Sequence, residues 1–292
     1  MTRFAPSPTG DLHLGHAYAA LFANEKARRS DGRFLVRIED IDAGRCREGF
    51  VERNLKDLRW LGLAWEEPAL RQSARLPAYA AALDRLRMLD VVYPCFCTRK
   101  AIQAEIKAAG GAPHADGTGI GYPGTCRGLD PARRTERMKA GNSWALRLDS
   151  AKALRLTGTI DWVDRRFGRY RVTADEVGDV VIARKEFPVS YHLAVVVDDA
   201  AQGVTLVTRG EDLLPATHVH RVLQALLDLP VPDWWHHPLC RDTSGRRLAK
   251  RAGDASIRAL RDKGLTVAEV LKMVRPDPTV GARRLAAEEV LR

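Results

Sequence analysis

The N-terminal part of the chain alternates between short extended segments and one periodic helical stretch. Residues 3–5 are predicted to be extended, and they lead into a loop at 6–10 that holds two prolines and a glycine. Between residues 12 and 29, large apolar residues recur every three or four positions, as in an amphipathic helix, at Leu14, Tyr18, Leu21 and Phe22. A nearly continuous apolar run at 34–39 then predicts a buried strand. We expect a βαβ unit whose loop and helix start suit a phosphate group.

The rest of the chain predicts further helices and strands. Helices are expected at 46–61, 76–89, 131–140 and 216–227, and strands at 144–148, 193–199 and 203–208, while 234–240 forms a further segment before the basic stretch. The segment 95–187, with its glycine-rich loop and short strands, reads as an insertion into an α/β domain. A turn at 242–245 opens a basic stretch, and only short helices are expected beyond it.

Length and composition exclude several classes of protein. A chain of 292 residues corresponds to one or two domains. With 45% hydrophobic and 29% charged residues, the composition is that of a globular protein and not of a disordered one. No apolar run approaches the roughly 18 residues of a membrane span, and the N-terminus lacks a secretion segment. We expect a cytoplasmic protein with no membrane partner, and nothing demands more than a monomer.

The charge balance points to a polyanionic partner but has a second explanation. Lys and Arg total 47 against 37 acidic residues, a net charge of +10. Phosphate contacts and counterion release favour such an excess. Because 37 of the 47 cations are Arg, an arginine-rich genome would give the same balance.

Five cysteines, an odd number without a secretion signal, argue against a disulfide framework: Cys46, Cys95, Cys97, Cys126 and Cys240. Three of them fall within 32 residues and suit one structural zinc ion, which normally takes four protein ligands. His114, in the glycine-rich loop, is a chemically ordinary fourth candidate. The alternative is that these cysteines are small core residues without a metal.

Residues 6–16 read PSPTGDLHLGH and carry the clearest chemistry. His13 and His16 are three apart at a predicted helix start, so both rings should project from one side of the first turn. Two imidazole donors beside the positive helix end would suit a triphosphate. An isolated H-x-x-H could equally be two surface histidines.

These histidines occur together with a second motif, and the pair resembles the two signatures of class I aminoacyl-tRNA synthetases. The segment 13–16 matches HIGH with Leu for Ile. The late segment Arg247, Leu248, Ala249, Lys250 and Arg251 is similar to KMSKS and keeps its second lysine. The resemblance implies that His13, His16 and Lys250 bind ATP, with Mg²⁺, and that Lys250 neutralises charge as the substrate carboxylate attacks the α-phosphorus. The departures at Ala249 and Arg251 affect closure of this loop more than chemistry.

Three further blocks look like the glutamyl and glutaminyl branch of that family: 3–10, 37–42 and 208–214. The resemblance implies a glutamate pocket formed by Arg3, Phe4, Ala5, Pro6, Ser7, Glu39, Tyr191 and Arg209. Arg3 would pair with the side-chain carboxylate, since a guanidinium matches a carboxylate bidentately, and Glu39 would hold the α-ammonium. A salt bridge between Glu39 and Arg37 is the alternative for that acid. Tyr122 would be the fourth zinc ligand beside Cys95, Cys97 and Cys126.

The family fold implied is α/β, with a Rossmann-like parallel sheet in a catalytic domain for ATP and glutamate. We assign that domain to 1–94 and 188–239, an inserted α+β domain with the zinc site to 95–187, and the KMSKS-like loop with a short helical segment to 240–292. Only 42 residues follow Lys250, too few for the anticodon-binding region of the full-length branch members.

In this length, the chain resembles a short paralogue within the glutamyl and glutaminyl branch. The resemblance implies a ligase that makes glutamyl-adenylate from L-glutamate and ATP without tRNA, then transfers the glutamyl group to queuosine in the anticodon of tRNA(Asp). The alternatives are a truncated glutamyl-tRNA synthetase that charges the acceptor end, an inactive synthetase-like tRNA-binding module, and a small-molecule adenylyltransferase.

Overall fold

The structure is a computed structural model, and it describes residues 1–98, 100–102, 104, 122–184, 189–240 and 256–274. The chain divides into two compact units. The first comprises Met1–Gln72, Thr205–Asp212 and Trp234–Arg292, and the second comprises Ser73–Val204 and Leu213–Asp233. The predicted boundaries at 95 and 187 both fall inside the second unit, and the three-domain assignment stays a prediction. No helix of the described residues is long and apolar enough to span a membrane.

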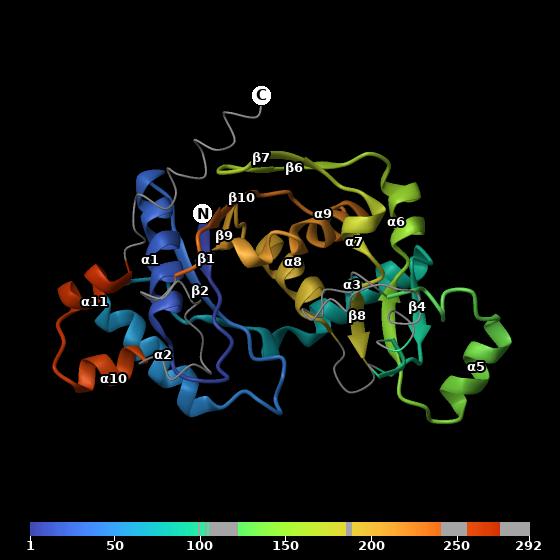
Figure 1. Ribbon diagram of the computed structural model, residues 1–292, viewed down its shortest axis with the longest axis horizontal. Coiled ribbons are helices and arrows are strands. Elements are labelled where there is room, and N and C mark those ends of the chain that lie inside the picture. Colours follow the sequence, from blue (N-terminus) through green and yellow to red (C-terminus); the bar gives the residue numbers. More distant parts are fainter. Residues whose placement is uncertain (99, 103, 105–121, 185–188, 241–255, 275–292) are drawn as a thin grey trace. The chain divides into compact units, whose positions relative to one another are not determined.

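The first unit is built on the predicted βαβ crossover. Strand β1 (Thr2–Phe4) pairs in parallel with β2 (Phe34–Ile38), and β2 pairs in parallel with the short β3 (Leu70–Arg71). Helix α1 (Leu14–Arg29) connects β1 to β2 and lies beside both (Figure 1). The parallel α/β class expected from the sequence is confirmed.

The face of α1 that packs on the strands is made of alanines and not of the large apolar residues. Ala17, Ala20, Ala23 and Ala27 are each at most 1% exposed, and the Thr2 hydroxyl donates to the Ala23 carbonyl (2.8 Å). Small side chains let the helix approach the sheet closely. The neighbouring face meets β10 (Asp233–His237), where the Tyr18 and His237 ring centroids lie 4.9 Å apart.

The other elements of the first unit are α2 (Glu48–Trp60), within the predicted helix 46–61, β9 (Leu206–Gly210), which begins three residues later than the strand predicted at 203–208, the 3₁₀ turns η1 (Gln72–Arg75) and η2 (Glu211–Leu213), which were not predicted, and the short helices α10 (Ile257–Asp262) and α11 (Val267–Val274). Two backbone bonds join β9 to the chain start, because the amides of Thr205 and Leu206 donate to the Met1 carbonyl at 3.0 and 3.1 Å. Buried Asp57 of α2 accepts from Arg261 of α10 at 2.6 Å.

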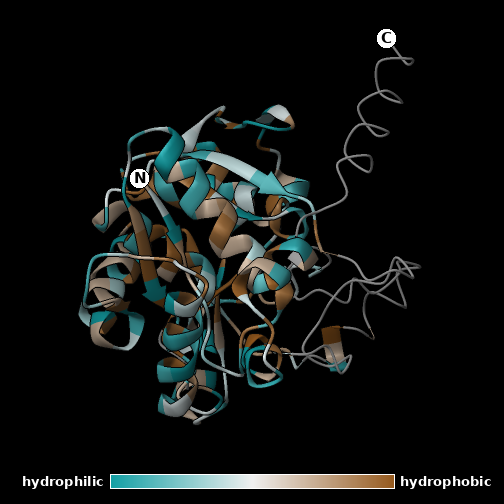
Figure 2. Ribbon diagram, turned by 90° about the vertical axis from the view of Figure 1, so that its left-hand side faces the viewer, coloured by the Kyte–Doolittle hydropathy of each residue, from teal (hydrophilic) through white to brown (hydrophobic). Residues whose placement is uncertain are grey.

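The second unit combines an antiparallel sheet with packed helices: α3 (Leu76–Met88), β4 (Val92–Cys95), α5 (Pro131–Lys139), β5 (Ala145–Leu148), α6 (Ser150–Thr157), β6 (Asp161–Asp164), β7 (Gly168–Arg171), α7 (Ala174–Val177), β8 (Val181–Arg184), α8 (Tyr191–Ala201) and α9 (Ala216–Leu226). One sheet has the order β4-β5-β8, and β6 with β7 forms an antiparallel hairpin. Figure 2 shows hydrophilic and hydrophobic residues mixed along the helices of the molecule.

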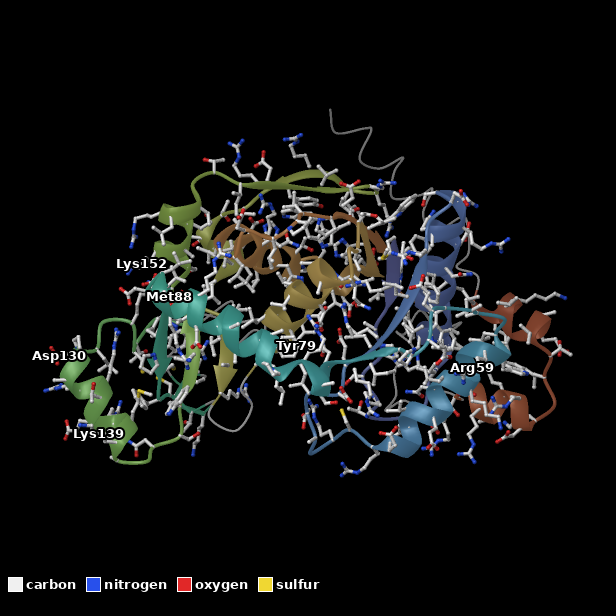
Figure 3. The ribbon with its side chains drawn as sticks, turned by 180° about the vertical axis from the view of Figure 1, so that it is seen from behind. Arg59, Tyr79, Met88, Asp130, Lys139 and Lys152 are labelled. Atoms are coloured by element: carbon white, nitrogen blue, oxygen red, sulfur yellow. The ribbon has the colours of Figure 1, made fainter. Side chains whose placement is uncertain are left out.

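The strand predicted at 193–199 is wrong, because these residues belong to helix α8. The run is apolar on every side because the helix is buried on nearly every side, and periodicity alone cannot distinguish that case from a buried strand. The Ser190 side chain caps the helix at the Leu193 amide. Buried Asp198 then accepts from Arg75 and from Tyr79 of α3, both at 2.7 Å (Figure 3 labels Tyr79).

The second unit contains a buried histidine that contacts a tryptophan and a carboxylate. His218 of α9 is 2% exposed, and its Nδ1 lies 3.4 Å from the Trp162 indole N–H and 3.3 Å from the Glu176 carboxylate. Burial lowers the pKa of His218 from 6.5, partly opposed by Glu176. The neutral ring therefore accepts from Trp162.

We predict that His218 contributes stability that is complete above pH 6.5 and is lost as the pH falls toward its lower folded pKa, because the unfolded chain binds the proton more tightly. In His218→Asn, a neutral amide oxygen can still accept from Trp162. Thermal unfolding at pH 7.5 and 5.5 should show a smaller loss of Tm in this variant than in the parent. Equal losses would contradict the assignment.

Candidate active site

The start of α1 is closed by the two histidines of the first signature. His13 is the N-cap residue, with extended backbone, and its Nδ1 accepts from the Gly15 amide at 3.1 Å. His16 reaches back so that its Nδ1 accepts from the His13 amide at 3.2 Å. This reciprocal capping box satisfies two N–H groups that a helix start leaves without backbone partners.

The cap also fixes how the imidazoles present their protons. The ring centroids lie 3.8 Å apart and the rings are stacked at 29°, on one side of the first turn as the spacing predicts. Because each Nδ1 accepts a backbone N–H, the proton of each neutral ring resides on Nε2. Both Nε2 groups are therefore hydrogen-bond donors beside the positive end of a helix.

Gly15, the glycine of the first signature, gives the His13 ring its room. A Cβ at position 15 would lie 3.0 Å from Cε1 and 3.1 Å from Nδ1 of His13. A larger residue would therefore require the His13 ring to shift by a few tenths of an ångström.

The loop after β1 is joined to the end of β2. The Glu39 amide donates to the Pro6 carbonyl, and the Ser7 hydroxyl donates to the Glu39 carbonyl, both at 3.0 Å. The Glu39 carboxylate lies 3.6 Å from the fully buried Arg37 guanidinium, so the salt bridge considered as its alternative role is present. Its side chain is 14% exposed, so the protein does not fully enclose it.

Two buried guanidinium groups lie on adjacent segments of the same unit. Arg3 of β1 donates to the Thr208 carbonyl of β9 at 3.2 Å, and Arg209 donates to His236 Nε2 at 3.0 Å. Arg3 and Arg209 are 4% and 6% exposed. Positive charges in a poorly solvated place favour an anionic ligand. Sequence reasoning missed His236, which sits in a Trp-Trp-His-His run on β10 and orients Arg209.

The remaining predicted pocket residues fall in different places. Phe4 ends β1 and is buried, and Ala5 follows it in the loop. Tyr191 belongs to the second unit, at the first turn of α8, with its ring 5.6 Å from those of His192 and His220. Nδ1 of His192 lies 3.2 Å from Nε2 of His220.

The second signature, residues 247–251 with Lys250, lies outside the described residues, as does His114. The described chain resumes at Ser256, which forms a β-bridge with His13. The Ile257 amide donates to the Leu12 carbonyl at 2.8 Å. Lys250 thus precedes, by six residues, a segment that pairs with the first signature.

The three clustered cysteines are brought together in the second unit. The sulfur atoms of Cys95, Cys97 and Cys126 all lie within 4.8 Å of one another, and these residues could hold a metal ion. The Tyr122 hydroxyl lies 3.2 Å from the Cys95 sulfur and 3.8 Å from that of Cys97. Ligands of a tetrahedral zinc with bonds of about 2.3 Å stand about 3.8 Å apart, so the donor set fits such an ion.

The surroundings of the cluster are cationic. The Arg147 guanidinium stacks over the Tyr122 ring, 3.9 Å from its centroid. Burial would raise the pKa of Cys95, but hydrogen bonds from Tyr122 and the Cys97 backbone, together with Arg147, lower it. Burial and a hydrogen bond with Cys126 raise the pKa of Cys97 to about 12. Burial, and to a smaller extent the hydrogen bond with Cys95, raises the pKa of Tyr122. A bound cation would act against these increases by binding the deprotonated forms.

Comparison with known proteins identifies the family. Residues 1–277 match the model described as "tRNA synthetases class I (E and Q), catalytic domain". The chain belongs to this family of class I aminoacyl-tRNA synthetases.

Within the family, the chain is similar to the glutamyl-Q tRNA(Asp) synthetase of Rhodobacter capsulatus, with 48% identity over 94% of this chain and 99% of the relative. It is 38% identical to the glutamate–tRNA ligase of Aquifex aeolicus, over 90% of this chain but only 54% of that enzyme. The crystal structure of the glutamate tRNA ligase from Elizabethkingia meningosepticum in complex with its amino acid superimposes with a TM-score of 0.72 at 28% identity. That match covers 87% of this chain and 52% of the ligase.

Proposed function

We propose that this protein activates glutamate with ATP and transfers the glutamyl group to queuosine in the anticodon of tRNA(Asp). The observation that carries the proposal is the 48% identity to a glutamyl-Q tRNA(Asp) synthetase over nearly the full length of both chains. The capped histidine pair and the buried arginines described above supply chemistry that this reaction needs.

The glutamate pocket is proposed around β1 and its neighbours. Arg3 and Arg209 give the positive field that a dicarboxylic substrate needs, and Arg3 pairs with the side-chain carboxylate. The Ser7 hydroxyl donates to the Glu39 carbonyl and the Glu39 amide donates to the Pro6 carbonyl, which holds Glu39 at the loop where an α-ammonium would bind. The Arg37 contact orients the Glu39 carboxylate. Phe4, Ala5 and Pro6 complete the first-unit part of the pocket in the proposal, and a role for Tyr191 of the second unit rests on the family resemblance alone.

The nucleotide is proposed to bind at the start of α1. The Nε2–H groups of His13 and His16 face phosphate oxygens at the positive helix end, where an anion is favoured. Lys250, which follows in the second signature with Arg247, Leu248, Ala249 and Arg251, supplies a cation for the charge that develops on the triphosphate. Mg²⁺ enters as part of the ATP substrate.

The two steps balance without a further reactant. A glutamate carboxylate oxygen attacks the α-phosphorus, the bond to the β-phosphate breaks, and pyrophosphate leaves with the negative charge. A queuosine hydroxyl then attacks the carbonyl carbon of the glutamyl-adenylate. AMP leaves, and the hydroxyl proton is released. His13, His16 and Lys250 act in the first step by stabilising charge on the phosphates.

The metal is proposed to be one structural zinc ion, held by Cys95, Cys97, Cys126 and Tyr122. Support comes from the position of the Tyr122 hydroxyl, which lies within 3.8 Å of two of the sulfurs and accepts from the Cys126 amide at 2.9 Å. Four anionic ligands would give the site a net negative charge, and the Arg147 guanidinium over Tyr122 offsets part of it. When bound, zinc would fix the geometry of this loop and would take no part in the reaction.

We predict that queuosine is required for the transfer. Radiolabelled glutamate should enter tRNA(Asp) that contains queuosine and should not enter the same tRNA lacking it. A glutamyl-tRNA synthetase that charges the acceptor end, the second candidate raised by the 38% identity to the Aquifex aeolicus ligase, would label a glutamate tRNA instead. Equal label in both tRNA(Asp) preparations would contradict the proposal. Absence of glutamate-dependent exchange of pyrophosphate into ATP would indicate an inactive, tRNA-binding relic.

We predict that two substitutions separate the capping role of His13 from its role toward ATP. His13→Asn keeps an N-cap acceptor but loses the Nε2 donor, whereas His13→Ala loses both. His13→Ala should lower the free energy of unfolding by about 1 kcal/mol, and His13→Asn by much less. Pyrophosphate exchange should fall by roughly 10²–10³-fold in both, as for loss of one charge-stabilising donor. Full activity in His13→Asn would leave His13 as a cap only.

We predict that metal binding depends on the thiolate cluster and on Tyr122. The purified protein should hold about one equivalent of zinc, and Cys126→Ser should lose it. Tyr122→Phe should weaken zinc binding by more than the roughly 10–100-fold that loss of an outer-shell partner costs, measured by competition with a chelator. Cys240→Ser, at a cysteine outside the cluster, is the matched control. Unchanged affinity in Tyr122→Phe would remove Tyr122 from the ligand set.

A further inference from the structure

Helix α5 (Pro131–Lys139) has no buried residue. It begins where the Asp130 carboxylate accepts from the amides of Ala132 (2.8 Å) and Arg133 (3.4 Å), and it stands apart from the β4-β5-β8 sheet (Figures 1 and 3). Most helical stability in proteins comes from packing an apolar face. Packing in the core of the second unit therefore does not explain this short helix, and its exposed side chains are where a function would lie.

The helix is strongly basic, and its charges are not neutralised locally. It carries four cations and a single acid: Arg133, Arg134, Arg137, Lys139 and Glu136. Among the described residues, no carboxylate forms an ion pair with Arg133, Arg137 or Lys139.

The arginine-rich hairpin of β6 and β7 shows the contrast. There Arg165 pairs with Asp233 at 2.9 Å, and both Arg169 and Arg171 pair with Asp161, at 3.4 and 3.3 Å. The excess charge of α5 is thus a local feature and does not follow from a high arginine content alone.

The basic helix is nevertheless held in place. The Arg137 guanidinium lies 5.1 Å from the centroid of the Phe96 ring. In the sequence, Phe96 stands between two cysteines of the cluster, Cys95 and Cys97. Arg134 donates to the Arg127 carbonyl at 2.5 Å and lies 5.9 Å from the Tyr93 ring centroid. These contacts fix the helix, while Arg133 and Lys139 remain exposed.

We propose that α5 binds the phosphate backbone of the substrate tRNA through Arg133, Arg137 and Lys139; this rests on the tRNA substrate of the proposed function. Arg133 and Arg137 are four residues apart and share one helix face. Cations that lack acidic partners give up no ion pair when they meet phosphates. Each phosphate contact also releases counterions, so the contribution of α5 depends on salt.

The test is the affinity for queuosine-containing tRNA(Asp), measured by fluorescence anisotropy between 50 and 200 mM salt. The variant R133Q/R137Q/K139Q removes the three charges. The control R28Q/K56Q/R155Q removes as many from scattered exposed positions on α1, α2 and α6. We expect the α5 variant to bind at least about tenfold more weakly at low salt. Its slope of log K against log salt should be shallower by roughly 0.9 for each phosphate that the variant no longer neutralises. The control should change affinity less than about twofold.

Pyrophosphate exchange, which uses no tRNA, distinguishes the two proposals. Suppose that the parent exchanges pyrophosphate and binds tRNA(Asp). If the tRNA affinity of the α5 variant then equals that of the parent, or falls no more than that of the control, the α5 proposal is overturned and the proposed function stands. If the parent shows no glutamate-dependent exchange, the proposed function fails first. R133Q/K139Q, at positions without described packing contacts, repeats the test if the triple variant unfolds. R133K/R137K/K139R keeps the charge and should retain affinity.

Discussion

The first unit depends on the backbone hydrogen bonds of its N-terminal segment. Strand β1 pairs in parallel with β2, which aligns Thr2 with Phe34 and Phe4 with Val36, and the Met1 carbonyl just before β1 accepts from the amides of Thr205 and Leu206 at the start of β9. These hydrogen bonds bring together chain segments separated by more than 200 residues. The Arg3 guanidinium adds a side-chain bond to the Thr208 carbonyl of β9, so Arg3 lies beside the strand that carries Arg209.

The start of α1 is under two constraints that agree with each other. The histidines cap the helix with their Nδ1 atoms, which stabilises the helix start. Because Nδ1 is used in this way, the protons remain on Nε2, where they can be donated to a ligand. Gly15 serves both, because a Cβ there would lie 3.0 Å from the His13 ring and crowd it. The β-bridge between His13 and Ser256 adds a third contact at this point, from a residue that follows the second signature by five positions in the sequence. Ring orientation at this site is therefore set by backbone atoms.

The sequence was informative where the pattern was local, and less so where tertiary contacts decide. Helix α1, strand β2 and the class of the fold follow from periodicity and from the loop between them. The apolar run of α8 was misread as a strand, because burial on all sides removes the helical period. The sequence pattern did not predict that the alanines of α1 form its buried face, because the larger apolar residues recur on a neighbouring face of the helix. His236, which orients Arg209, and Gly15, which leaves room for His13, become visible only when distances are known. The three cysteines were grouped correctly, since their spacing already limits how far apart they can be.

The second unit explains how a helix without a core face can still be rigid. Buried Asp179 accepts from the Arg127 guanidinium at 2.9 and 2.6 Å and from the Ser150 hydroxyl at 2.8 Å, while Arg147 donates to the Asp179 carbonyl at 2.6 Å. Because a buried carboxylate without its partner is costly, these bonds resist displacement of the loop that follows Cys126. Leu129, which packs against the cysteine cluster, carries that constraint to the start of α5. Binding by a preorganised surface loses less conformational entropy. A metal in the cluster would then reinforce an orientation that Asp179 already imposes, so α5 would stay partly positioned when the metal is absent.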